Sequence, residues 1–197
     1  MSPRLRRVEQ RAATRHALLD AAAEVFAAQG LHGAAIEEVC ERAGFSRGAF
    51  YSNFSSKRQL FLEVLDRHTA QAMSRIAVAF EHGANLQERV TNGARAAEEV
   101  IAHDRTWCQL YYEGWVAASR DETFRALYAQ RYHDTRELLT GMLDSEIADR
   151  HPDTDSDELA AAILAMFEGY ALQRIIDPQA LPDGFLARGL KLLLSSL

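Results

Sequence analysis

The four prolines of this 197-residue chain constrain its fold most strongly, because all of them lie outside residues 4–151. Proline breaks the interior of a helix, so a span this long without it leaves room for several long helices. The same span is rich in Ala, Leu, Glu and Arg, and it lacks the sustained apolar–polar alternation of half-buried strands. We therefore predict an all-α protein.

We expect about nine helices, placed by their apolar periodicity and by the Gly, Pro and polar breaks between them. The first covers about residues 8–29 and ends at Gly30, and two short helices lie within residues 34–57. The remaining helices are expected over about residues 57–82, 86–103, 105–119, 122–150, 157–176 and 183–195.

Residues 34–57 carry the most specific pattern in the chain. Ile36, Val39, Cys40 and Ala43 have the spacing of one buried helical face. Gly44 is expected to end that helix in a left-handed turn, because glycine has no Cβ to oppose it. After the turn, Ser46 can cap a second short helix, whose aromatic residues Phe50 and Phe54 would pack on the core. This arrangement is typical of a helix-turn-helix, whose second helix enters the DNA major groove.

The residues that would project from the second helix are Arg47, Gly48, Ser52 and Asn53, with Tyr51 beside them. A helical hairpin without a DNA role is the alternative. It would ordinarily expose Glu and Lys rather than this set. Arg suits guanine and Asn suits adenine in the major groove, and Gly48 would allow close approach to the DNA. The pattern favours DNA binding.

Residues of about 10–68 resemble the DNA-binding domain of the TetR family of bacterial regulators. The resemblance rests on the Ala-Gly-Phe-Ser-Arg-Gly turn, the Phe-Tyr-Ser-Asn-Phe segment and the Ser-Lys pair that opens the next helix. It implies contacts of Tyr51 and Lys57 with phosphates, and it places Arg47, Gly48 and Asn53 near base edges. The full set of expected DNA-binding residues is Ser46, Arg47, Gly48, Ala49, Tyr51, Ser52, Asn53 and Lys57.

The chain departs from that family pattern at two places. Ala34 and Ala35 stand where many relatives have Thr, so a hydroxyl cap and a phosphate contact are missing and weaker binding is expected. Ser55 replaces a common proline, which we expect to be harmless. Ser56 and Gln59 form a capping-box pattern at the start of the following helix.

Charge is divided unevenly along the chain. The net charge is −6, but residues 1–70 hold 10 Lys and Arg against 8 Asp and Glu, whereas the other 127 residues hold 12 against 20. A basic head on an acidic body is expected if only one end meets phosphate. The four arginines Arg4, Arg6, Arg7 and Arg11 form a basic N-terminal arm, for which a solvated flexible tail is the alternative.

The composition also indicates a compartment. The two cysteines, Cys40 and Cys108, fit a reducing environment, and Cys40 is expected to be a buried core thiol. We see no signal peptide and expect no apolar stretch that approaches membrane-spanning length. The protein is therefore predicted to be cytoplasmic.

The body of the chain carries an aromatic set at helical spacing. Core packing is the simpler interpretation for each residue alone, but a group of Trp and Tyr residues often lines a cavity between helices. The resemblance implies an inducer pocket here, and the predicted ligand-binding residues are Trp107, Tyr111, Trp115, Tyr128, Phe167 and Tyr170. Its polar contacts could come from Glu113, Arg131, His133 and Arg174, although a surface or rim charge is the simpler interpretation for each of them.

The helices over about 157–176 and 183–195 are apolar on more than one face, which is expected of an interface between subunits. We predict a homodimer through these two helices. The expected domains are the arm and helix-turn-helix over 1–55, a connecting helix over 56–82, and a ligand-binding and dimerisation domain over 83–197.

Together these features predict a ligand-responsive regulator of transcription, expected to be a repressor that a small hydrophobic or aromatic effector releases from a palindromic DNA operator. We expect no enzymatic activity, cofactor, metal or membrane partner, because the sequence has no glycine-rich nucleotide motif, no Glu-x-x-His pair and no Cys/His metal spacing. Two alternatives stay open. One is an all-α enzyme or ligand-binding protein that retains the head, and the other is a DNA-binding scaffold without an inducer.

Overall fold

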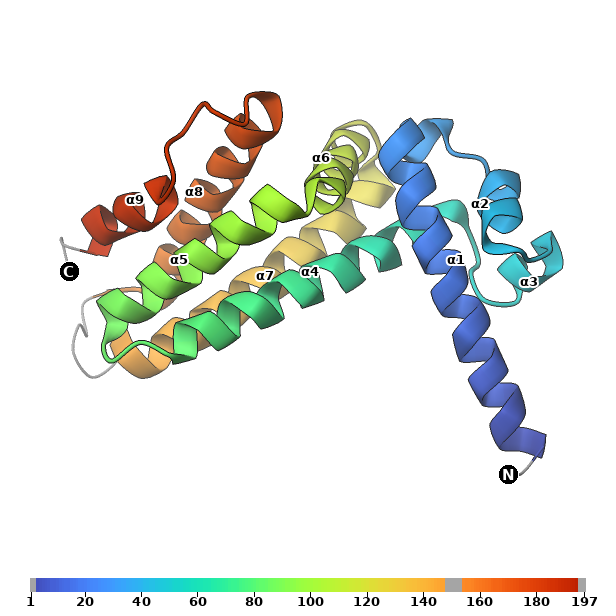
Figure 1. The fold of residues 1–197 in the computed structure, drawn as a ribbon, viewed down its shortest axis with the longest axis horizontal. Helices are drawn as coiled ribbons and strands as arrows, with labels where there is room; N and C mark the ends of the chain where they lie inside the picture. The colour runs from blue at the N-terminus through green and yellow to red at the C-terminus, as the bar shows by residue number, and fades with distance from the viewer. Residues whose placement is uncertain (1–2, 148–153, 195–197) are drawn as a thin grey trace. The chain divides into compact units, whose positions relative to one another are not determined.

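The computed structural model describes residues 3–147 and 154–194, which are helical and contain no strand (Figure 1). The predicted all-α class is confirmed. The nine helices of these residues are α1 (Pro3–Gly33), α2 (Ile36–Ala43), α3 (Arg47–Tyr51), α4 (Lys57–Glu81), α5 (Leu86–His103), α6 (Arg105–Arg120), α7 (Glu122–Ile147), α8 (Ser156–Ile176) and α9 (Phe185–Leu194). The predicted continuations of α7 to residue 150 and of α9 to residue 195 lie outside the described residues.

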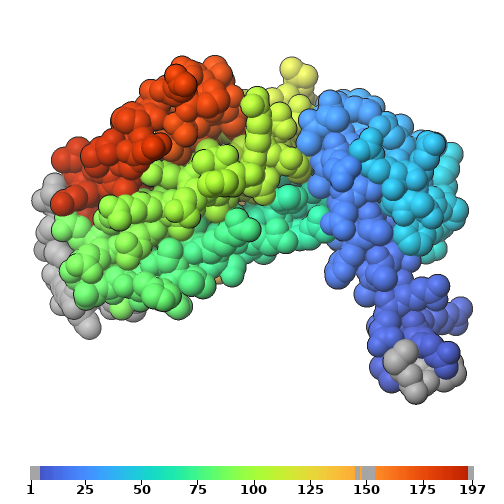
Figure 2. All heavy atoms as spheres, in the orientation of Figure 1, coloured from blue at the N-terminus to red at the C-terminus, as the bar shows by residue number. Residues whose placement is uncertain are grey.

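Helix α1 is longer than predicted at both ends. It begins at Pro3, because proline is tolerated at the first helical position, where its missing N–H has no partner to lose. The basic arm is therefore helical from Pro3 onward, and its first turns extend beyond α2 and α3 (Figures 1 and 2). At Gly30 the backbone kinks, with φ 70° and ψ 171°, and helix resumes up to Gly33.

The described chain forms two compact units. The first contains Met1–His68 together with Gln109–Arg125, and the second contains Thr69–Cys108 and Ala126–Leu197. Helices α4, α6 and α7 each contribute to both units. The inclusion of most of α6 and the start of α7 in the first unit was not predicted from the sequence.

Aromatic side chains dominate the core of the first unit. The rings of Phe26 on α1 and Phe61 on α4 meet edge to face, with centroids 5.2 Å apart. Phe50 and Phe54 are buried, with centroids 5.8 Å apart. Phe124 at the start of α7 lies 6.2 Å from Phe61. The predicted inward residues of α1, namely Leu18, Ala22, Val25 and Phe26, are all fully buried.

In the second unit, α9 lies along α5 (Figure 2). The carboxylate of Glu98 on α5 accepts hydrogen bonds from the backbone N–H groups of Gly184, at 3.0 Å, and Leu186, at 2.7 Å. These N–H groups lie at the start of α9, where a helix has unpaired donors and favours negative charge. Glu98 therefore caps α9 from a neighbouring helix.

Both cysteines are buried, as expected for Cys40. Burial raises the pKa of the Cys40 thiol and raises the pKa of the Cys108 thiol to about 12. Buried neutral thiols of this kind are inert and serve packing.

Helix α8 contradicts the expectation that no apolar stretch approaches membrane-spanning length. By length and composition alone it is apolar enough to cross a membrane, and only 22% of its most apolar 18-residue window is buried. A soluble helix that is apolar on several faces has the same composition, and it needs a partner to cover those faces.

The turn between α2 and α3 offers a clean test of backbone strain. Gly44 has φ 74°, and a Cβ added there would meet no atom within 4 Å. We therefore expect Gly44→Ala to lower the free energy of unfolding by about 1–2 kcal/mol through left-handed strain alone. Chemical denaturation measures the change.

Gly141→Ala is the matched control, because a Cβ on Gly141 of α7 would also meet nothing within 4 Å. Its helical backbone favours alanine, so this variant should gain about 0.5–1 kcal/mol. Equal effects of the two substitutions would contradict the assignment of a left-handed turn.

Candidate nucleic-acid interface

Helix α3 begins where the sequence predicts. Ser46 has extended backbone angles, and its Oγ accepts a hydrogen bond from the backbone N–H of Ala49 at 3.2 Å, which is the geometry of an N-cap. The preceding turn is closed by a hydrogen bond from the N–H of Phe45 to the carbonyl of Cys40, at 2.9 Å. With Phe50 fully buried, the opposite face of α3 is directed to solvent.

The predicted DNA-binding residues divide by exposure. The exposed ones are Ser46, Arg47, Gly48, Tyr51 and Ser52, and the half-buried ones are Ala49, Asn53 and Lys57. The side chain of Arg47 is 60% exposed and Tyr51 is 52% exposed, so both can reach a partner without rearrangement of the core.

Arg47 has a neighbour that sequence reasoning missed. Its guanidinium pairs with the carboxylate of Glu37 on α2 at 2.8 Å and lies 6.0 Å from the centre of the Tyr51 ring. The hydrogen bond to Tyr51 and the Glu37 charge both raise the pKa of Arg47, which therefore stays charged. An exposed ion pair contributes no more than about 1 kcal/mol, so a nucleic acid can displace Glu37.

The polar side chains at the end of α3 donate hydrogen bonds to backbone carbonyls of that helix. The hydroxyl of Ser52 donates to the carbonyl of Gly48 at 2.8 Å, and Nδ2 of Asn53 donates to the carbonyl of Ala49 at the same distance. Oδ1 of Asn53 is buried and accepts no hydrogen bond from the described residues. The adenine contact expected of Asn53 stays a prediction, and it requires the bond to Ala49 to break.

Lys57 also has a role that the sequence did not reveal. Its Nζ donates to the carbonyls of His32, at 3.1 Å, and Ala34, at 2.8 Å. Burial lowers the pKa of this ammonium. Lys57 therefore ties the start of α4 to the connection between α1 and α2, and its predicted phosphate contact has only the remaining N–H available.

The segment before α4 shows why Ser55 can replace a proline. Ser56 caps the helix as predicted, accepting from the N–H of Gln59 at 3.1 Å. The side chain of Gln59, however, accepts from the N–H of Ser55, at 2.6 Å, and from its hydroxyl, at 2.7 Å. Neither donor would exist in proline.

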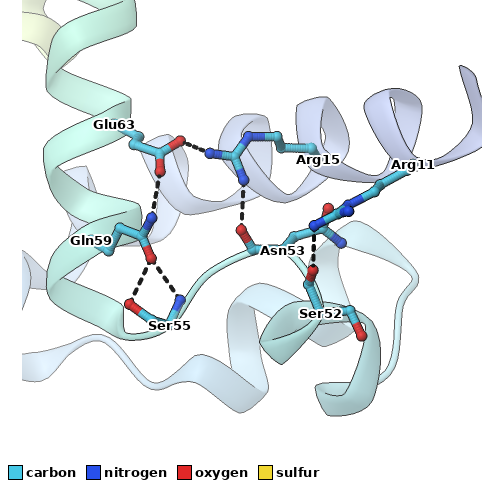
Figure 3. Close-up of polar contacts among 7 residues, drawn as sticks. All are labelled: Arg11, Arg15, Ser52, Asn53, Ser55, Gln59 and Glu63. Atoms are coloured by element: carbon cyan, nitrogen blue, oxygen red, sulfur yellow. Dashed lines mark hydrogen bonds and ion pairs between the residues drawn. The ribbon is translucent and has the colours of Figure 1, made fainter. Parts of the chain in front are cut away.

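Two arginines of α1 contact the residues that follow α3 (Figure 3). Arg11 donates to the carbonyl of Ser52 at 2.9 Å, and Arg15 donates to the carbonyl of Asn53 at 2.6 Å. Arg15 also pairs with Glu63 on α4 and lies 4.3 Å from the centre of the Phe54 ring. The spacing of four residues puts both arginines on one face of α1, a signal that could have been seen in the sequence.

Most of α6 and the start of α7 belong to the same compact unit as α3. Glu113, which the sequence offered as a possible polar contact of the pocket or as a surface charge, accepts a hydrogen bond from the N–H of Leu31 at 3.3 Å. A Cβ on Gly30 would lie 2.7 Å from this carboxylate, which ends a flexible side chain and can shift, so it is the φ of 70° that favours glycine at the kink. Asp121 pairs with Arg58. A hydrogen bond from the backbone of Phe124, together with Arg58, lowers the pKa of Asp121.

The predicted ligand-binding aromatics have different environments. Trp107, Tyr128 and Tyr170 are buried, Tyr111 and Phe167 are half-buried, and Trp115 is 55% exposed. Trp107 and Phe167 are brought together, with ring centroids 5.8 Å apart, whereas Tyr170 stacks on Phe185 of α9 at 6.4 Å. Both are packing contacts between aromatic rings of different helices, and the effector pocket stays a prediction.

A surface cavity of about 540 Å³ lies between α5 and α9. Polar and charged side chains line it, including Arg95, Arg188 and Lys191, and it contains none of the predicted aromatic residues. Its chemistry differs from that of the predicted hydrophobic pocket.

Comparison with known proteins identifies the family. Residues 18–64 match the family profile described as "Bacterial regulatory proteins, tetR family", and residues 87–195 match "BetI-type transcriptional repressor, C-terminal". The chain belongs to the TetR family. It is therefore a DNA-binding transcriptional regulator with a helix-turn-helix, as the resemblance implied.

Relatives of this TetR-family regulator include proteins with opposite effects on transcription. The transcriptional activator FasR of Mycolicibacterium smegmatis is 36% identical over 96 residues, which make up 49% of this chain and 44% of FasR. The transcriptional repressor KstR2 of the same organism is 27% identical over 150 residues, covering 75% of this chain and 73% of KstR2. The solved structure of Salmonella enterica GusR has a TM-score of 0.77 at 22% identity, over 93% of this chain and 94% of GusR, and shares the fold.

For the TetR-family head, Lys57→Met tests the tie between α4 and the α1–α2 connection. Because two backbone carbonyls lose a charged donor, we expect the free energy of unfolding to fall by about 1–2 kcal/mol. Arg42→Met is the control, since the ion pairs of Arg42 with Glu24 and Glu38 are exposed and their loss should change stability by less than about 1 kcal/mol. Equal, small changes in both variants would contradict the structural role of Lys57.

Proposed function

We propose that this TetR-family regulator reads its operator with α3 and that it is a repressor. The observation that carries the proposed contact surface is the exposed pair Arg47 and Tyr51 beside Gly48. A Cβ on Gly48 would meet only the Ser46 Oγ, at 3.6 Å, so packing within the protein does not require glycine there. Close approach of the helix to a DNA groove explains the residue better.

The proposed interface comprises the eight predicted residues and the basic start of α1. Arg47 would read a base edge, while Tyr51 and the free N–H of Lys57 would bind phosphates. Arg6, Arg7 and Arg11 are exposed along α1, and a helical arm of this kind adds cationic charge near the backbone of the duplex. Such contacts would offset the hydroxyl that Ala35 lacks at the start of α2.

We propose a homodimer formed through α8 and α9. Leu172 is 44% exposed, Ile176 77% and Phe185 40%, and most of the apolar window of α8 is uncovered in the single chain. A second copy would bury these faces, as helices do in a two-fold four-helix contact. The two heads would then bind half-sites about one helical turn, or a multiple of it, apart.

Repression and ligand response are supported by the family and by the C-terminal match to a repressor type. A small hydrophobic or aromatic effector would bind among the aromatics of α6, α7 and α8 and favour a conformation that does not fit the operator. Helix α4 belongs to both compact units and would carry the change, as would α6, which holds Leu31 through Glu113. Relatives that are transcriptional regulators support a cytoplasmic, non-enzymatic protein.

The role of Arg47 is tested by fluorescence anisotropy with the promoter DNA that flanks the protein's gene. Arg47→Ala should weaken binding by about 5- to 150-fold, because loss of a bidentate base contact costs about 1–3 kcal/mol. The control is Arg42→Ala, which removes an exposed arginine of α2. Binding that is indifferent to the sequence of the duplex, or unaffected by Arg47→Ala, would contradict the proposal.

The dimer is tested by light scattering. We expect wild-type protein to have twice the 22.0 kDa mass of the chain, and Ile176→Asp to shift it toward the mass of one chain, since a buried unpaired carboxylate opposes association. Leu138→Asp introduces the same charge at a 58% exposed position of α7 and should leave the dimer intact. A wild-type mass of one chain at micromolar concentration would refute the proposed dimer.

A further inference from the structure

We propose that Arg15 is a positioning residue for DNA recognition: it sets the orientation of α3 by holding the end of that helix against α1 and α4. The inference rests on the proposed DNA-reading role of α3. It assigns to Arg15 no contact with DNA.

The guanidinium of Arg15 joins three elements (Figure 3). From α1 it donates to the carbonyl of Asn53, which follows α3, and it pairs with Glu63 on α4. Its Cζ lies 4.3 Å from the centre of the Phe54 ring, which is buried. A planar guanidinium can make these contacts at once because its donors form a rigid fork.

Helix α3 needs such support because it is very short. It comprises five residues, Arg47–Tyr51, far fewer than an isolated helix requires in water. The last carbonyls of any helix lack partners within it, and they favour nearby cations. Here the carbonyls of Ser52 and Asn53 accept from Arg11 and Arg15, so α1 determines where the end of α3 lies.

The network continues on the other side of Arg15. Gln59 donates to Glu63 at 3.0 Å and accepts from the N–H of Ser55 at 2.6 Å. Arg15 therefore connects to both ends of the segment between α3 and α4, directly at Asn53 and through Glu63 and Gln59 at Ser55 (Figure 3). Loss of Arg15 would release this segment while the aromatic core beneath it stays in place.

A purely structural ion pair between α1 and α4 is the competing interpretation. The chain offers a matched example, since Arg67 on α4 pairs with Asp20 on α1 at 2.7 Å. None of the hydrogen bonds or ion pairs described for Arg67 or Asp20 involves the α3 segment. Removal of Arg67 therefore deletes the same charge and one α1–α4 ion pair without touching the end of α3.

The test compares Arg15→Met with Arg67→Met on a duplex that the wild-type protein selects from a random-sequence pool, and on an unselected duplex. For Arg15→Met we expect binding to the selected duplex to weaken by about tenfold or more, the loss that one charge-assisted hydrogen bond corresponds to. Binding to the unselected duplex should fall far less than binding to the selected one, because non-specific binding is spread over many phosphate contacts, of which Tyr51 on α3 supplies one, whereas base readout depends on the orientation of α3.

The salt dependence of DNA binding distinguishes a positioning residue from one that contacts a phosphate. If Arg15 bound a phosphate, its loss would lower the slope of log affinity against log salt by about 0.9, whereas a positioning residue leaves the slope as it is in Arg67→Met. Arg15→Lys keeps the charge but not the fork, so it should melt near the wild-type temperature and still bind the selected duplex weakly. This variant keeps the test decisive if Arg15→Met does not fold.

Three results would overturn the inference: equal binding losses in the Arg15 and Arg67 variants, a reduced salt slope in Arg15→Met, or full recovery in Arg15→Lys. Each leaves the proposed function intact as long as the wild-type protein selects a sequence. Failure of the wild-type protein to select any sequence would refute the proposed function itself, and the positioning role with it.

Discussion

The burial of Phe50 and Phe54 is the interaction on which the rest of the head depends. A five-residue helix has too few internal hydrogen bonds to persist alone, so α3 exists because these rings are buried in the core that α1 and α4 supply. The same burial directs Arg47 and Tyr51 outward. Fold and function are therefore linked at α3, where one face is anchored by aromatic rings and the other is free for a partner.

Hydrogen bonds from cationic side chains then orient the helices that the aromatic core holds in place. Arg11, Arg15 and Lys57 each use a cationic head to hold backbone carbonyls at helix ends and connections. In a DNA-binding head, positively charged side chains are expected to bind phosphates, yet these three also hold the helices together. Part of the basic character of the head is thus structural.

Much of the head could be predicted because its signals are local. A glycine with positive φ, a serine cap and apolar residues at helical spacing act within a few residues, so Gly44, Ser46, the end of α2 and the start of α3 followed from the sequence. Glu37, Glu63 and Glu113 could not be assigned this way. Their partners Arg47, Arg15 and Leu31 lie 10, 48 and 82 positions away, and only folding brings them together.

The sequence by itself determined the all-α class, the helix-turn-helix and the family. Apolar periodicity, helix-ending Gly and Pro residues and ordered motifs depend only on which residues follow one another along the chain. The tertiary structure decided which charged side chains face solvent and which hold backbone, and it placed most of the aromatic set of the body in packing contacts. The physical reason is that a side chain's role depends on the neighbours it meets. Those neighbours come from distant segments, and the residue spacing within one helix does not predict them.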